Sequence, residues 1–342
     1  MDSPKILKNN KRKIKVEFER TSLWERLKAK YLTPNFLIQV IWKVFRILLL
    51  IGISYIIIFP FISKIFGSFM SKEDLIDATV RLIPKYPTLD TYKYIIRENQ
   101  YFTAFFNTFV LSALCAFVQT LICSIIGYGL AKFKFRGNSI VFLAVILTMI
   151  VPHDTIKLSM YMNFKYFDVF GIIGGISDLF NLEVASLDLI NTYWPMVILS
   201  IGGIAFKNGL YIFMMRQFFK GVPDELEEAA YIDGQGTFGT FVKIILPISI
   251  PMMITIFLFA FSWQWTDNFY TDLFFTQSGA ILMPRIVKVP STLADDSFTA
   301  KDLYESCIKN TCGLLIILPL MLFYSYMQRY LIQGIERSGI VG

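Results

Sequence analysis

The stretch GVPDELEEAAYIDGQGTFGTFVKIILPISIPMMITIFLFAFSWQWT, residues 221–266, joins two kinds of sequence that together indicate the fold. Its second half, Ile244–Thr266, carries no charged residue and is as long as one crossing of a lipid bilayer, which needs about 20 apolar residues. Its first half is polar and acidic and has the spacing of a short helix. The stretch therefore predicts a membrane-spanning helix that follows a short helix at the membrane surface.

Five further uncharged windows flank this one, at Ile47–Ser63, Asn99–Ala131, Gly137–His153, Leu189–Phe206 and Asn310–Gln328. Apolar residues make up 55% of the 342 residues and charged residues 17%, against about 25% charged in soluble domains. This composition excludes a soluble protein, a disordered chain and a disulfide scaffold. It predicts an all-α integral membrane protein with six transmembrane helices. Prolines in or beside the spans are expected to kink or end helices; they are Pro60, Pro152, Pro247, Pro251 and Pro319.

The distribution of basic residues orients the six spans. Of the 33 Lys and Arg residues, 21 fall in the amino-terminal tail, the segments after the second and fourth spans, and the carboxyl end. Because Lys and Arg gather on the cytoplasmic side of membrane proteins, we expect both termini to be cytoplasmic. We expect residues 1–46 to form a basic cytoplasmic tail and residues 47–342 to form the transmembrane domain.

The acidic segment before the fifth span carries the signals of a short helix, Pro223–Asp233. Proline suits the first helical position, and the acidic residues after it place negative charge at the positive end of the helix dipole. Gly234 can take the positive φ that ends a helix. Leu226, Ala229 and Ala230 are expected on one face by their spacing. A helix of this length is marginal alone in water, so it needs a partner surface.

These residues resemble a known signature. The EAA motif of the permease subunits of binding-protein-dependent ABC importers has the same residues at the same spacing as Glu228-Ala229-Ala230, Gly234, Ile244 and Leu246-Pro247. The loop that carries this motif covers about residues 216–247.

Other segments resemble the carbohydrate branch of this family, near the second permease of maltose-type systems. They are Asn107-Thr108, Gly127–Phe133, Phe135–Gly137, Arg216–Phe219, Trp263–Asp267, Gln328–Tyr330 and Gly334. The resemblance covers roughly residues 48–342. The chain departs from the family pattern in its long basic tail and in an insertion at about residues 169–187.

The resemblance implies the type I ABC importer permease fold and a role in importing a mono- or oligosaccharide across the cell membrane of a bacterium. The chain would be non-catalytic and would pair with a homologous permease, two ATP-binding cassette subunits and an extracytoplasmic solute-binding protein, in contact with lipid and not with nucleic acid. It would bind no cofactor, while the partner ATPases would use ATP and Mg. The residues expected to contact an ATPase are Glu225, Leu226, Glu228, Ala229, Ala230, Asp233 and Gly234.

Four residues near the predicted outer end of the fifth span are candidates for a substrate path, namely Trp263, Trp265, Asp267 and Tyr270. Aromatic faces can stack on sugar rings, and a carboxylate accepts hydrogen bonds from hydroxyls. An aromatic belt at the membrane interface is the other explanation. Lys207 lies where the fourth span meets a further apolar run. It is either inside the membrane, at a cost of roughly 2.5–3.5 kcal/mol, or it snorkels to the inner surface.

Other functions are disfavoured by what the sequence lacks. His153 is the single histidine and no paired Cys-x-x-Cys motif exists, so no metal site is expected; Cys307 and Cys312 could bridge or stay free. Residues 234–239 match a dinucleotide-binding string, but they follow a predicted helix where that fingerprint needs a strand. An ion-coupled secondary transporter is the alternative, and it would need carboxylates within the spans, which the six windows lack.

Overall fold

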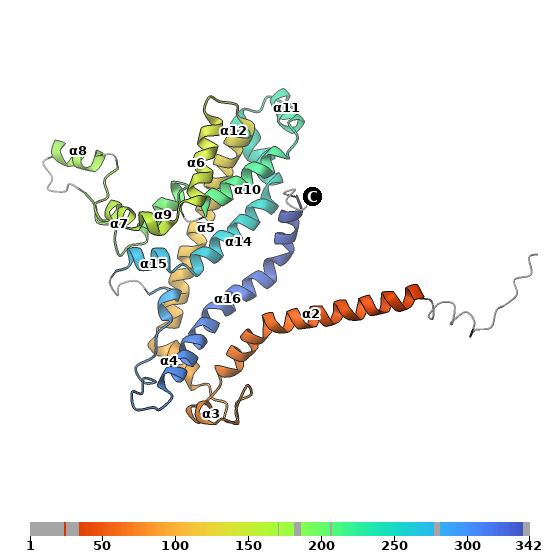
Figure 1. The fold of residues 1–342 in the computed structure, drawn as a ribbon. Coiled ribbons are helices and arrows are strands. Elements are labelled where there is room, and N and C mark those ends of the chain that lie inside the picture. The colour runs from red at the N-terminus through yellow and green to blue at the C-terminus, as the bar shows by residue number, and fades with distance from the viewer. Residues whose placement is uncertain are drawn as a thin grey trace, which may run out of the picture. The chain divides into compact units, whose positions relative to one another are not determined.

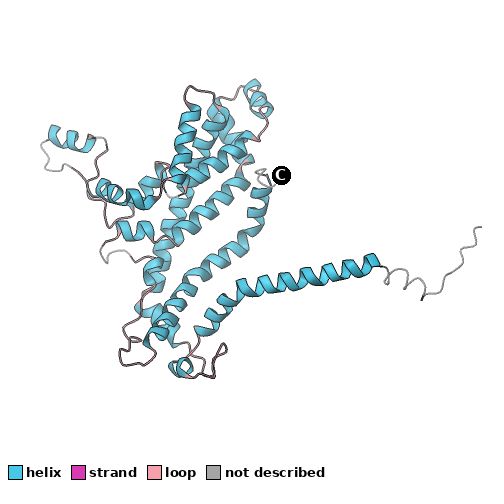
Figure 2. Ribbon diagram, in the orientation of Figure 1, coloured by secondary structure: helices cyan, strands magenta, loops and turns pink. Residues whose placement is uncertain are grey.

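The computed structural model describes Trp24 and residues 34–169, 171–180, 186–205, 207–276 and 281–337. Within these residues the regular structure is helical (Figure 2). The described residues form no strand, and their single β-type pairing is an isolated antiparallel bridge between Phe167 and Leu187. A helix satisfies each backbone N–H and C=O within its own segment, which the interior of a bilayer requires. Most of the predicted tail lies outside the described residues.

Figure 1 shows how the helices follow one another along the chain. In chain order they are α2 (Pro34–Gly67), α3 (Lys72–Ile76), α4 (Asp90–Glu98), α5 (Tyr101–Lys132), α6 (Asn138–Ile150), η1 (His153–Ile156), α7 (Lys157–Lys165), α8 (Ile172–Leu179), α9 (Trp194–Ile201), α10 (Asn208–Lys220), α11 (Glu225–Ile232), α12 (Thr237–Thr240), η2 (Phe241–Ile245), α13 (Leu246–Ile248), α14 (Ile250–Trp265), α15 (Phe269–Phe274), η3 (Met283–Ile286) and α16 (Lys301–Arg337).

Residues 1–63 and 64–342 form two compact units. The described part of the first unit, apart from Trp24, is α2 up to Ser63, and every residue from Ile38 to Ile62 is exposed along it. The helix begins ahead of the predicted start of the first span at Ile47, because the residues before that point are also mostly apolar. Lys43 and Arg46 interrupt them, and long basic side chains can extend toward the membrane surface from such positions.

Helix α5 is the central element of the second unit. It packs against α4, α9, α10, α14 and η3, and α14 packs in turn against α16. Small side chains make this possible, since they let neighbouring backbones approach closely in membrane proteins. They recur on the buried side of α5 at three- and four-residue spacing, as Ala104, Thr108, Ser112, Cys115, Ala116, Thr120, Cys123, Ser124 and Gly127.

Two glycines mark the closest helix crossings. A Cβ atom built on Gly127 of α5 would lie 2.6 Å from Met215 Cβ and 3.0 Å from the Arg216 backbone nitrogen of α10. A Cβ atom on Gly209 of α10 would lie 2.5 Å from Thr148 Oγ1 of α6. Helix α10 is therefore held between α5 and α6 at contacts that only glycine permits.

By length and composition, three helical segments can each cross a membrane, namely Ile38–Gly67, Tyr101–Lys132 and Lys301–Leu331. Two bent pairs would bring the number of spans in the described residues to five. Asn138–Ile150 and His153–Lys165 meet at 94°, and Thr237–Ile248 and Ile250–Trp265 meet at 75°. Pro152 lies in the first break, and Pro247 and Pro251 flank the second, as expected of prolines. Pro60 and Pro319 instead lie inside continuous helices.

The predicted fourth window, Leu189–Phe206, does not form one spanning helix. Its helical part is α9, which has 8 residues and is about 12 Å long at 1.5 Å per residue. The chain then turns through Gly203, which has a φ of 68°, and Lys207, which has a φ of 71°, and continues as α10. An interrupted pair of helices thus replaces the single helix that hydropathy alone predicts.

The glycine crossing at α5 predicts a difference between two neighbouring substitutions. Gly127→Ala should lower the thermal stability of the purified protein in detergent, because overpacking costs about 1–3 kcal/mol. Gly129→Ala is the matched control, since a Cβ there meets nothing within 4 Å and alanine favours the helix. Equal melting temperatures for the two variants would contradict the crossing.

Candidate functional site

Helix α11 and the residues after it form a sharply terminated surface element. The N–H of Gly234 donates to the carbonyl of Tyr231 at 3.0 Å, and the N–H of Gln235 donates to that of Ala230 at 2.9 Å. Gly234 has a φ of 80°. These are the two hydrogen bonds and the left-handed residue of a Schellman motif, so the prediction that Gly234 ends the helix is confirmed. The helix is shorter at both ends than Pro223–Asp233.

One buried amine joins α11 to α5. Lys132 Nζ donates to the Val222 carbonyl at 2.7 Å and to Asp224 Oδ1 at 2.5 Å, and it lies 3.7 Å from Glu227 Oε1. The Lys132 side chain is 7% exposed. Its hydrogen bond and charge lower the pKa of Asp224 below the usual value. The carboxylate of Asp224, the residue before the helix, therefore accepts a hydrogen bond from this lysine and does not cap the helix.

Two of the three residues expected on one face of α11 are open to solvent. Ala230 is buried, but Leu226 and Ala229 are exposed, and Glu227 takes the second buried position. The reason is that Lys132 attracts Glu227 toward the protein. Six of the seven residues expected to contact an ATPase are consequently accessible, namely Glu225, Leu226, Glu228, Ala229, Asp233 and Gly234.

Three apolar residues outside the predicted set extend this surface. Ile232 is 86% exposed and Phe238 is 78% exposed, and Tyr231 lies between Ala230 and Ile232 with its ring accessible. Large apolar side chains in an otherwise polar loop were the signal that could have identified them. We call the exposed residues of 225–238 the coupling surface. It combines carboxylates with apolar side chains, as protein docking surfaces do.

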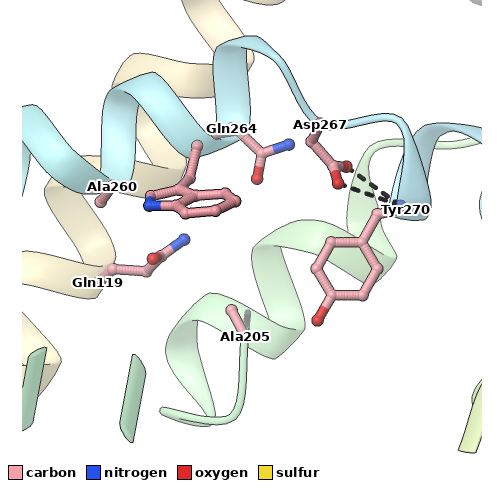
Figure 3. A pocket seen from close by; sticks show the side chains of 7 residues that line it. Gln119, Ala205, Ala260, Gln264, Asp267 and Tyr270 are labelled. Atoms are coloured by element: carbon pink, nitrogen blue, oxygen red, sulfur yellow. Dashed lines mark hydrogen bonds between the residues drawn. The ribbon is translucent and has the colours of Figure 1, made fainter. Parts of the chain in front are cut away.

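A polar pocket lies near the end of α14 (Figure 3). Three of the four predicted path residues, Trp263, Asp267 and Tyr270, line it, and the structure adds Gln119, Ala205, Ala260 and Gln264. The fourth, Trp265, lies in the core at 1% exposure, where Nε1 donates to the Ile316 carbonyl at 3.0 Å. The pocket itself holds only about 20 Å³, which is space for about one water molecule.

Hydrogen bonds orient the polar groups of this pocket. Gln119 Nε2 donates to Ser200 Oγ at 3.2 Å. The Asp267 carboxylate accepts from the Tyr270 N–H at 3.2 and 3.3 Å, as the dashed lines in Figure 3 show. Burial raises the pKa of Asp267 to about 6, against backbone N–H groups that lower it. The pocket thus presents amide and carboxylate groups beside an indole ring.

A larger cavity of about 490 Å³ adjoins the pocket and shares Ala205 with it. It is lined by the end of α6, by residues 151–154 and by Lys207, Gly209 and Phe269. Lys207 is the N-cap residue of α10, in the break between α9 and α10, and its Nζ is 4.7 Å from the centre of the Trp263 ring. His153 makes edge-to-face contacts with Phe269 and Tyr270.

The structure also describes the cysteines and the glycine-containing string at residues 234–239. All four cysteines are free thiols, including Cys307 and Cys312. The described residues contain no group of His, Cys, Asp and Glu that could hold a metal ion. Residues 234–239 follow helix α11 and lead into α12, so they lack the strand that a dinucleotide fingerprint requires.

The bent helix pairs and the surface helix α11 belong to a helical protein with candidate membrane spans, and comparison with known proteins identifies its family. Residues 123–337, more than half of the chain, match the family of binding-protein-dependent transport system inner membrane components. The chain belongs to this family, whose members are non-catalytic membrane subunits.

Relatives extend the match along most of the chain. Protein LplC of Bacillus subtilis is 26% identical over 88% of this chain and 95% of its own length. The arabinooligosaccharides transport system permease protein AraQ of Halalkalibacterium halodurans is 28% identical over 85% and 93%. The polygalacturonan/rhamnogalacturonan transport system permease protein YtcP of Bacillus subtilis is 26% identical over 86% and 96%. The predicted resemblance to carbohydrate ABC permeases is confirmed.

Solved structures show the same fold. A chain of a bacterial ABC transporter involved in the import of the acidic polysaccharide alginate aligns with a TM-score of 0.62 at 19% identity, covering 85% of this chain and 96% of that one. A chain of the alginate transporter in complex with its pentasaccharide-bound periplasmic protein aligns with a TM-score of 0.57 at 16% identity, covering 90% and 97%. The predicted permease fold is thus confirmed at the level of architecture.

The Schellman motif predicts a position-specific effect of alanine. Gly234→Ala should weaken α11, because a left-handed conformation costs an L-residue roughly 1–2 kcal/mol. Hydrogen exchange of the α11 amides should speed up several-fold. Gly236→Ala is the control, since Gly236 has a φ of −78° and open space around it. If both variants exchange like the wild type, Gly234 does not terminate the helix as described.

The raised pKa of Asp267 predicts a pH-dependent stability. The folded protein holds this proton more tightly than the unfolded chain, whose carboxyl has a pKa near 3.8. Wild type should therefore lose stability relative to Asp267→Asn as the pH rises from about 4 to about 6, with no further change above that. The measurement is the difference in melting temperature across pH 4–8. A constant difference would mean an ordinary carboxyl group.

Proposed function

We propose that this chain is one of two permeases of an ATP-driven sugar importer and that the coupling surface docks on a cytoplasmic ATPase. The observation that carries the proposal is α11 itself. It is a short surface helix that ends in a Schellman motif, and its exposed residues Leu226 and Ile232 lie beside carboxylates, with Phe238 of α12 following them. Exposed apolar residues of this size mark an interaction site, and the family resemblance of the EAA motif indicates the partner.

The proposal includes the other subunits. Two ATP-binding cassette subunits would supply ATP hydrolysis with Mg, a homologous permease would complete the translocation path, and a solute-binding protein would deliver the substrate from outside. The aligned alginate transporter structure includes a periplasmic binding protein, which supports such an assembly. This chain would hold no nucleotide or other cofactor.

The topology of the proposal is six crossings with both termini in the cytoplasm. Five of these crossings are the candidate spans described above. The remaining one, fourth in chain order, would be formed by α9 and α10 together. Their 8 and 13 residues extend about 12 and 20 Å at 1.5 Å per residue, which is enough when combined to cross a core of about 30 Å. The excess of Lys and Arg in the inner segments supports this orientation.

The substrate is proposed to be an oligosaccharide that passes over the polar pocket. Relatives are named for the transport of arabinooligosaccharides and of polygalacturonan and rhamnogalacturonan, which supports the carbohydrate class. Gln119, Gln264 and Asp267 offer the hydrogen-bonding groups that a hydroxylated ligand needs, beside the Trp263 ring. The pocket is too small to enclose a sugar, so it would form one wall of a path completed by the second permease.

Affinity purification tests the docking surface. The tagged chain, expressed in its own host and extracted in mild detergent, should retain an ATPase and a second permease. Ile232→Glu should reduce ATPase recovery at least tenfold, because a docking hot spot is worth about 2 kcal/mol or more. Ile83→Glu is the control, an exposed isoleucine at 68% outside the coupling surface.

The opposite result would be equally clear. A chain that purifies alone and moves solute into liposomes without ATP would overturn the proposal and favour an ion-coupled secondary transporter.

A further inference from the structure

The junction of α5 and α11 contains an unusual concentration of charge for a nearly closed site. Lys132 is the last residue of α5, and its side chain is 7% exposed. Glu227, which with Ala230 is buried on α11, is 9% exposed. Asp224, the third charge, has a side chain that is 79% exposed. One amine thus faces two carboxylates, one buried and one open to solvent.

Such an arrangement is costly unless each charge has a partner. An unpaired buried charge is strongly destabilising, so a buried pair resists removal of either member. Lys132 satisfies this condition by its hydrogen bonds to Val222 and Asp224, with Glu227 3.7 Å away. Breaking the contact would strand Glu227, whose Oε1 has no hydrogen bond within the protein. The junction therefore resists separation of α11 from α5.

Among the described residues, this is the site where ion pairs join α11 and its preceding residue to a spanning helix. Helix α11 also packs on α12, and Tyr128 of α5 interacts with its Glu227 and Tyr231. Loops that change their dihedral angles can absorb a displacement. An ion pair to the end of a long helix transmits it instead.

Helix α5 also reaches the polar pocket. Gln119 lies 13 residues before Lys132 on the same continuous helix, a distance of about 20 Å along the axis at 1.5 Å per residue. Gln119 lines the pocket together with Trp263 and Asp267. A displacement applied at Lys132 would thus arrive at the pocket through one rigid element.

We propose that Lys132 is the positioning residue that fastens the coupling helix to α5, so that movement of α11 is passed along α5 to Gln119 and the polar pocket. This inference rests on the proposed function, since it takes the ATPase as the source of the movement. It adds the route by which the movement travels. The competing route runs along the chain, from α11 through residues 221–224 into α10.

The test uses the complete transporter purified with its partners in lipid nanodiscs. Hydrogen–deuterium exchange is compared between the nucleotide-free state and the state trapped with ATP and vanadate. Peptides covering α5 and residues 260–270 report the movement at the pocket. ATPase recovery and ATP hydrolysis are measured on the same samples.

Lys132→Met should keep the ATPase bound and hydrolysing ATP, but the nucleotide-dependent change in exchange at α5 and the pocket should be lost. Lys132→Arg should retain the change. Lys134→Met is the matched control, because Lys134 is an exposed lysine two residues away. A Lys132→Met transporter that responds to nucleotide like the wild type overturns the proposal.

A charge exchange covers the case in which Lys132→Met does not accumulate. Lys132→Glu alone should lose the response, and combining it with Glu227→Lys should restore the response at least in part. A double variant that assembles with the ATPase but shows no nucleotide-dependent change in exchange at α5 and the pocket counts against the proposal. Failure of the proposed function has a separate signature, since the wild-type sample itself would then contain no ATPase.

Discussion

Close packing around α5 is the constraint on which the rest of this structure depends. In a bilayer the hydrophobic effect does not draw helices together, so contact must come from close backbone approach and from hydrogen bonds between side chains. The small residues of α5 supply the first, and Gln119 with its bond to Ser200 of α9 supplies an example of the second. Helices α9, α10 and α14 all take their positions from this one surface, and with them the pocket and the attachment of α11.

The two candidate sites are thereby parts of one mechanical system rather than separate features. The coupling surface presents apolar side chains to solvent on α11 and on the residues after it. Gly234 ends the helix, and Lys132 joins it to α5. The polar pocket needs amide and carboxylate groups in a low-dielectric setting, and these are held by hydrogen bonds to neighbouring backbone and side chains. Both requirements are met by elements that converge on α5.

Local patterns predicted well what local chemistry determines. The EAA spacing, the stop at Gly234 and the prolines at the two bends needed only neighbouring residues to be understood. The buried face of α11 could not be predicted, because it depends on Lys132, which lies 92 positions from Asp224 in sequence. Gln119 could not be predicted as a pocket residue either, because Trp263 and Asp267, which line the pocket with it, are distant in sequence. Trp265 could have been separated from Trp263, since helix residues two apart do not share a face.

The glycine crossings carry a consequence for how the protein is made. Helix α10 lies between α5 and α6, with Gly127 accommodating it on one side and its own Gly209 accommodating Thr148 on the other. Chains are synthesised from the amino terminus, so α5 and α6 exist before α10 leaves the ribosome. The two helices that meet α10 at these glycines are therefore synthesised before it, whereas α14, which α10 also contacts, is synthesised after it. Packing at the two glycine crossings can thus proceed in chain order.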